Sequence, residues 1–165
     1  MAPHTSRRSP TADQLRVWRA FIETTMQLQS ALSSRLQSES GLSTGDYGVL
    51  LALSEADGRR LRSSELADDI GWERSRLSHH LGRMERRGLV DRVPCETDNR
   101  GAWIVLTSAG AGAFRRSSVR HLHAVRELFV DTLTADQLAA VADVTAALRT
   151  GLPRHRLAGQ KREDV

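Results

Sequence analysis

Apolar residues recur every three or four positions along two long stretches of the chain. Residues 12–38 contain the first set, which comprises Leu15, Trp18, Phe21, Ile22, Met26, Leu28, Leu32 and Leu36. Residues 107–131 contain the second set, which comprises Phe114, Leu122, Val125, Leu128 and Phe129. Because a helix brings positions three and four apart onto one face, each stretch predicts a long helix with a wide apolar face.

Helix-capping residues predict two further helices. The segment LSTGD at residues 42–46 has the spacing of an apolar residue, an N-cap and an acidic third residue, so a helix should start there. The Asp-Gly turn at residues 57–58 should end it. The segment TADQ at residues 134–137 is a capping box and predicts a final helix that continues through Leu148.

Two shorter helices and a hairpin are predicted between the long helices. Ser63 and Ser64 are expected to cap a helix of about two turns that ends at Gly71. The next helix occupies residues 73–88, and its apolar face consists of Leu77, Leu81 and Met84. Two short runs rich in Val, Ile and Trp, at residues 89–94 and 102–106, predict strands that flank a polar loop. The order helix, turn, helix, hairpin is that of a winged helix-turn-helix.

The polar face of the second short helix carries groups that can read DNA. At 100° per residue, the side opposite the apolar face presents Ser75, Ser78, His79, Gly82, Arg83 and Arg86. We expect Ser75, Ser78, His79 and Arg83 to reach base edges in the major groove. Ser64 and Arg74 are expected to contact phosphates. A solvated face that binds nothing is the alternative, and the hairpin that follows favours DNA.

Composition and charge add little to this interpretation. The 165 residues are enough for one domain, and the net charge is +4. Every basic residue except Lys161 is arginine, which suits phosphate and guanine, although a GC-rich coding sequence explains most of this bias. The sequence has no apolar run long enough to span a membrane and no apolar leader, and it has a single cysteine. These features favour a cytoplasmic protein without membrane contact.

The segment from Leu61 to Gly110 resembles the winged-helix core of MarR-type transcriptional regulators. It contains, in order, the motifs SSELADDIGW, RLSHHLGRMERRGLV, DNR and LTSAG. The resemblance implies a mainly α-helical fold with a small β-hairpin wing, flanked by long N- and C-terminal dimerisation helices. It also implies a sequence-specific DNA-binding regulator that acts as a homodimer on a pseudo-palindromic operator, as a ligand-responsive repressor.

The resemblance assigns roles to the loop between the two predicted strands. The equivalent of Arg100 enters the minor groove in such proteins, and the equivalent of Asp98 orients that arginine. Asn99 is also expected at the DNA, although the family more often has a basic residue there. Two further residues depart from the family pattern. At His79 the family's recognition helix often has a different polar residue, and at Glu73 the family usually has Ser or Thr as the cap before that helix.

The resemblance covers nearly all of residues 12–150 and suggests a division of the chain. Residues 12–42 and 108–150 would form a helical dimerisation domain, and residues 43–107 the winged helix-turn-helix. Residues 1–11 are expected to be a disordered tail and residues 151–165 a mobile basic tail. The long helices would expose too much apolar surface unless they packed together or against a second subunit.

The resemblance also implies a small-molecule effector, phenolic or antibiotic-like, that binds where the long helices meet the winged helix. Trp18, Met26, Tyr47 and His123 are the candidate lining residues, although core packing is the favoured interpretation for each. Effector binding would change the spacing of the two recognition helices and weaken DNA binding.

Three alternative functions are weaker. Cys95 could support redox regulation, but the chain has no second cysteine to resolve an oxidised thiol. The histidine pairs at residues 79–80 and 121–123 do not form a chelating face on a helix, and no catalytic or phosphate-loop motif is present, so we expect no metal, no cofactor and no enzyme. A winged helix that binds another protein would require an apolar recognition face, which this sequence lacks.

Overall fold

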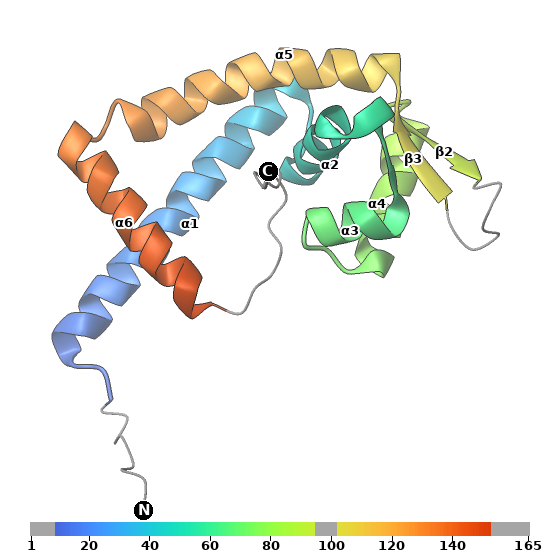
Figure 1. Ribbon diagram of the computed structural model, residues 1–165. Helices are drawn as coiled ribbons and strands as arrows, with labels where there is room; N and C mark the ends of the chain where they lie inside the picture. Colours follow the sequence, from blue (N-terminus) through green and yellow to red (C-terminus); the bar gives the residue numbers. More distant parts are fainter. Residues whose placement is uncertain (1–8, 95–101, 153–165) are drawn as a thin grey trace, which may run out of the picture.

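The structure is a computed structural model that describes residues 9–94 and 102–152. Three long helices form an extended arm on one side, and the shorter helices and a small sheet form a compact unit on the other (Figure 1). In chain order the elements are α1 (Ala12–Ser40), α2 (Thr44–Glu55), a 3-10 turn (Asp57–Arg59), β1 (Arg60–Arg62), α3 (Ser63–Asp69), α4 (Arg74–Arg86), β2 (Val90–Pro94), β3 (Ala102–Leu106), α5 (Ser108–Val125), a π-helical turn (Arg126–Val130) and α6 (Ala135–Gly151).

The predicted capping residues set the helix starts. The Ser43 and Thr134 side chains accept from the backbone N–H of Asp46 and Gln137, and the side chains of those residues accept in return from the cap N–H. The same reciprocal box starts α1, with Thr11 as its N-cap. Residues 1–8 of the predicted N-terminal tail and residues 153–165 of the predicted C-terminal tail lie outside the described residues.

The wing sheet has three antiparallel strands in the order β1-β3-β2. The hairpin of β2 and β3 is confirmed, with Val93 opposite Trp103. The strand β1, which pairs Arg62 with Trp103, was not predicted because three residues give too short a pattern to recognise. Since β3 is central, Arg62, Trp103 and Val93 form one row across the sheet, next to the wing loop.

The core lies in the compact unit between α2, α3, α4 and the sheet. Leu77, Leu81 and Met84 are fully buried, which confirms the predicted apolar face of α4. The start of α5 closes the core from outside, and Gly110 is required there because a Cβ at this position would lie 2.0 Å from the Leu89 carbonyl oxygen. The helix α4, the candidate recognition helix, is therefore held in place by its packing against this core.

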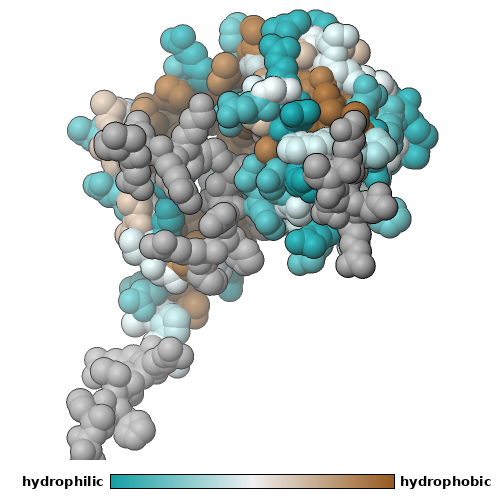
Figure 2. Space-filling model, turned by 45° about the vertical axis from the view of Figure 1, so that its right-hand side comes forward, coloured by the Kyte–Doolittle hydropathy of each residue, from teal (hydrophilic) through white to brown (hydrophobic). Residues whose placement is uncertain are grey.

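The arm is joined to the compact unit but leaves many of its own apolar residues uncovered. Within the arm, Arg35 of α1 forms two hydrogen bonds with Glu127, at 2.5 and 2.8 Å. Figure 2 shows hydrophobic side chains at the surface along the top of the molecule, where α5 runs. The exposed apolar residues of the arm are Leu15, Val17, Trp18, Phe21, Met26, Val119, Leu122, Val130, Val144 and Leu148. Among the helices that the structure describes, none has the length and hydropathy of a membrane span.

Candidate nucleic-acid interface

The helix α4 presents the polar face that the sequence predicts. Ser75, Ser78, His79 and Arg83 are all exposed and share one side of the helix, opposite its buried apolar face. Arg74, the first residue of the helix, is exposed as well. The structure thus brings these five predicted DNA contacts together on one surface.

The start of α3 differs from the prediction. Ser63 and Ser64 were expected to be capping residues, but they are the first two helical residues, and Arg62 occupies the N-cap. The Arg62 N–H donates to the Glu65 side chain at 2.9 Å, so the acid of the first turn does the capping. Ser64 is half-buried beside this turn, and a phosphate contact from it stays a prediction.

The turn between α3 and α4 has its own aromatic anchor. The N-cap of α4, Glu73, makes no side-chain cap hydrogen bond. The Arg76 guanidinium lies 4.1 Å from the centre of the Trp72 ring, in a cation–π contact. The edge of the same ring meets the His80 imidazole at a centroid distance of 5.0 Å. Trp72 therefore supports both the first turn and the middle of α4.

Arg92 fixes the wing relative to α4. Its guanidinium donates to the Ser78 carbonyl oxygen at 2.7 Å and lies 3.5 Å from the Glu85 carboxylate. Both partners belong to α4, so the strand β2 and the recognition face are held as one unit. The loop that β2 and β3 carry, with Cys95, Asp98, Asn99 and Arg100, lies outside the described residues.

Two arginines of β1 stack on an aromatic ring at the outer face of the sheet. The guanidinium carbons of Arg60 and Arg62 lie 4.8 and 5.2 Å from the centre of the Trp103 ring. The sequence did not predict this arrangement because it did not predict β1. The one available signal was the alternation of arginine on either side of Leu61, which places both arginines on the same face of a strand. It adds two positive charges to the wing sheet.

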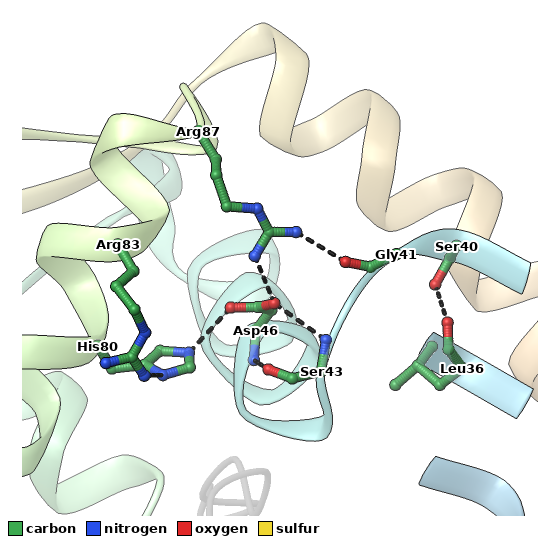
Figure 3. Close-up of polar contacts among 8 residues, drawn as sticks. All are labelled: Leu36, Ser40, Gly41, Ser43, Asp46, His80, Arg83 and Arg87. Atoms are coloured by element: carbon green, nitrogen blue, oxygen red, sulfur yellow. Dashed lines mark hydrogen bonds and ion pairs between the residues drawn. The ribbon is translucent and has the colours of Figure 1, made fainter. Parts of the chain in front are cut away.

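A buried carboxylate joins α4 to the corner between α1 and α2 (Figure 3). Asp46 is 3% exposed and accepts from Arg87 Nη1 at 2.7 Å and from the Ser43 N–H at 2.9 Å. Its other oxygen lies 3.0 Å from His80 Nε2. Arg87 also donates to the Gly41 carbonyl oxygen at 2.8 Å, which ties the end of α4 to the end of α1.

The electrostatics of this cluster favour an ionised Asp46 and a neutral His80. Burial alone would raise the pKa of the Asp46 carboxyl, but the hydrogen bonds from Arg87 and Ser43 outweigh it and hold the pKa below its usual value. Burial lowers the pKa of the His80 imidazole most; Asp46 opposes this shift and Arg83 reinforces it, and the net shift is downward. The sequence pattern identified Asp46 only as a helix-capping acid.

The four candidate ligand residues line neither of two pockets that the described residues form, one beside Arg116 and Arg120 and one beside Trp103. Trp18 and Met26 are 59% and 63% exposed, so core packing within one chain is wrong for both. His123 is exposed on α5. Tyr47 is half-buried, and its ring centre lies 4.8 Å from that of His121. Within the described ranges, no group of His, Cys, Asp or Glu side chains could hold a metal ion.

Comparisons with known proteins decide the family. A sequence profile of the MarR family matches residues 40–101. The structure is similar to that of Sco3205 from Streptomyces coelicolor, a MarR family transcriptional regulator solved in complex with DNA. The two are 36% identical over 93% of this chain and 96% of that chain, with a TM-score of 0.82. The chain belongs to the MarR family.

Other MarR-family structures agree with this assignment. AbsC from Streptomyces coelicolor is 36% identical over 88% of this chain and 99% of that chain, with a TM-score of 0.78. A variant of MarR from E. coli, complexed with operator DNA, shares the fold at 22% identity over 88% of this chain and 100% of that chain, with a TM-score of 0.71. No curated protein sequence matches the chain. The protein is a MarR-family DNA-binding transcriptional regulator and not an enzyme.

Proposed function

We propose that this MarR-family protein is a repressor that binds a pseudo-palindromic operator as a homodimer and releases it when a small effector binds. The observation that carries the proposal is the exposed polar face of α4, held rigidly to the wing by Arg92. Sco3205, at 36% identity, was solved in complex with DNA, which supports the same mode of binding here.

The proposed DNA contacts come from the polar face of α4, from the residues beside it and from the wing loop. Ser75, Ser78, His79 and Arg83 would read base edges in the major groove, because their side chains carry donors and acceptors on an accessible helix face. Arg74 and Ser64 would contact phosphates on either side. In the wing loop Arg100 would enter the minor groove, oriented by Asp98, with Asn99 next to it.

A homodimer explains the uncovered apolar side chains of the arm. Large residues such as Trp18, Phe21 and Leu122 are 59%, 43% and 62% exposed in one chain, and a monomer rarely leaves so many apolar residues in water. A two-fold symmetric partner would bury them and place two α4 helices for half-sites about one helical turn apart.

An effector site would lie where α2 meets α5. Tyr47 of α2 packs there against Phe114 and His121, with ring centres 5.3 and 4.8 Å apart, and its hydroxyl lies 3.3 Å from the Ser118 hydroxyl. A ligand in this region would favour one spacing of the two DNA-binding units over another. Trp18, Met26 and His123 would contribute only through the dimer arrangement of the arm.

Operator binding by the purified protein tests the proposal. Fluorescence anisotropy would compare DNA selected from a random pool, or DNA upstream of the protein's own gene, with a scrambled duplex at two salt concentrations. We expect Arg100→Ala to weaken operator binding about tenfold without changing the oligomeric state, whereas Arg115→Ala on α5 should have no effect. Equal affinity of the wild type for operator and scrambled DNA would refute the function, and wild-type affinity of Arg100→Ala would remove the wing from the mechanism.

A further inference from the structure

We propose that His80 is a positioning residue for DNA reading: it holds Arg83 in its DNA-facing position, and Asp46 holds His80. This inference rests on the proposed function and extends it to two residues that do not touch DNA. It starts from one geometric fact, which is that the two ring nitrogens of His80 face chemically opposite partners (Figure 3).

The partners of the ring fix its protonation and tautomer. The ionised Asp46 carboxylate can only accept, so His80 Nε2, which lies 3.0 Å from one of its oxygens, must carry the ring proton. The Arg83 guanidinium can only donate, so His80 Nδ1, at 2.8 Å from Nη2, must be the bare acceptor. Only the neutral ring protonated at Nε2 satisfies both contacts.

The rest of the cluster holds this ring in place. His80 is 7% exposed and meets the edge of Trp72, so it cannot turn freely. Asp46 is anchored in turn by Arg87 and by the capping box of α2. The chain of contacts therefore runs from the α1–α2 corner, through the buried carboxylate and the imidazole, to an exposed arginine on the recognition face.

Arg83 keeps most of its binding capacity in this arrangement. A guanidinium has five N–H donors, and the bond to His80 uses one of them. The others remain for a base edge or a phosphate, because the Arg83 side chain lies on the exposed face of α4. Holding a long, flexible side chain in the free protein lowers the ordering cost at the moment of DNA binding.

Protonation of His80 would undo the arrangement. The charged ring donates from both nitrogens, so it can no longer accept from Arg83 and would repel its charge. The groups that face the ring are Asp46 from α2 and Arg83 and Arg76 from α4, with Arg87 acting through Asp46. The two arginines of α4 and the burial oppose protonation, so the neutral form prevails at neutral pH and is lost only on acidification.

Two substitutions at His80 separate its two contacts. In His80→Asn the side-chain oxygen is as many bonds from Cα as Nδ1 is, so it keeps an acceptor for Arg83 and loses the donor to Asp46. In His80→Gln the amide nitrogen is as many bonds from Cα as Nε2 is, so it keeps the donor to Asp46 and loses the acceptor. We expect H80Q to weaken operator binding about tenfold, the scale of one arginine contact, and H80N to bind at least fivefold tighter than H80Q.

Folding stability should rank the same two variants in the opposite order. H80N should unfold at lower urea concentration than H80Q, because it leaves the buried Asp46 with one donor fewer. If His80 served packing alone, the less stable variant, H80N, would also be the one that binds the operator more weakly. Weaker operator binding by H80N than by H80Q would therefore refute the positioning role.

A double-mutant cycle and a pH series complete the test. In an Arg83→Ala background, H80Q should cost no further affinity, and a full additional loss would contradict the proposal. The wild type should lose operator affinity as the pH falls through the pKa of His80, which lies below its usual value, and H80N should lose less, because it has no imidazole to protonate. Wild-type protein that binds no operator would instead refute the proposed function, whereas specific wild-type binding with equal affinities for H80N and H80Q would refute the positioning role alone.

Discussion

Replacing Asp46 with alanine removes the acceptor at the centre of the cluster in Figure 3. Three groups lose their partner: the Ser43 N–H and Arg87 Nη1, which donate hydrogen bonds to it, and His80 Nε2, which lies 3.0 Å from it. The three are not equivalent, because the side chain of His80 is 9% exposed whereas that of Arg87 is 42% exposed. Arg87 can therefore return to water, and the imidazole N–H cannot.

The burial of each donor sets the size of the loss. An unpaired buried donor such as the His80 N–H costs about 1–3 kcal/mol. Loss of the capping acceptor costs about 1 kcal/mol, and the half-exposed pair with Arg87 contributes about 1 kcal/mol or less. We therefore expect the Asp46→Ala substitution to lower the free energy of unfolding by about 2–5 kcal/mol.

Urea denaturation at pH 7.5, followed by far-UV circular dichroism at one fixed protein concentration, measures this loss. The matched control is Glu55→Ala, which removes an exposed carboxylate from the same helix and should change stability by less than about 0.5 kcal/mol. A loss below about 1 kcal/mol for Asp46→Ala, with an unchanged m-value, would show that the cluster does not hold α4 to the α1–α2 corner.

Three further predictions address packing, assembly and pH. Gly110→Ala should destabilise the protein by more than about 2 kcal/mol because its Cβ would meet the Leu89 carbonyl. A Cβ added at Gly48 would have no atom within 4 Å, so Gly48→Ala should stabilise α2 by about 0.5–1 kcal/mol. The urea midpoints of the two variants would test both expectations. Leu122→Glu should convert the proposed dimer to a monomer in light scattering, and an unchanged mass would place the interface elsewhere. The pKa of His80 in the folded state lies below its usual 6.5, so between these two pH values the unfolded state binds more protons than the folded state. The free energy of unfolding should therefore fall as the pH drops below about 6.5. A flat profile down to about pH 5 would contradict a neutral buried ring.

Local signals in the sequence were enough to predict the helices and the hairpin. The capping segments at residues 42–46 and 134–137 act within one helical turn, so their effect does not depend on the rest of the fold. The apolar spacing of α4 also identified its buried face, because apolar residues three and four positions apart lie on the side of a helix that packs against the core. The predicted polar face follows from the same geometry.

Contacts between distant elements could not be read from the sequence. Asp46 and Arg87 are 41 residues apart, and nothing near either residue indicates that they pair. The strand β1 exists only because β3 supplies its partner, which lies more than 40 residues later in the chain. The buried position of His80, next to the exposed His79, likewise depends on where α2 packs and not on the histidine itself.

The specificity ratio of the protein tests the central claim most directly. This ratio is the affinity for the selected operator divided by that for a scrambled duplex, both measured at physiological salt. For the wild type we expect at least about 10³, and for the triple variant S75A/S78A/H79A a ratio at least tenfold lower with nearly unchanged affinity for scrambled DNA, because the phosphate contacts remain. An unchanged ratio in the triple variant would contradict base reading by the exposed face of α4.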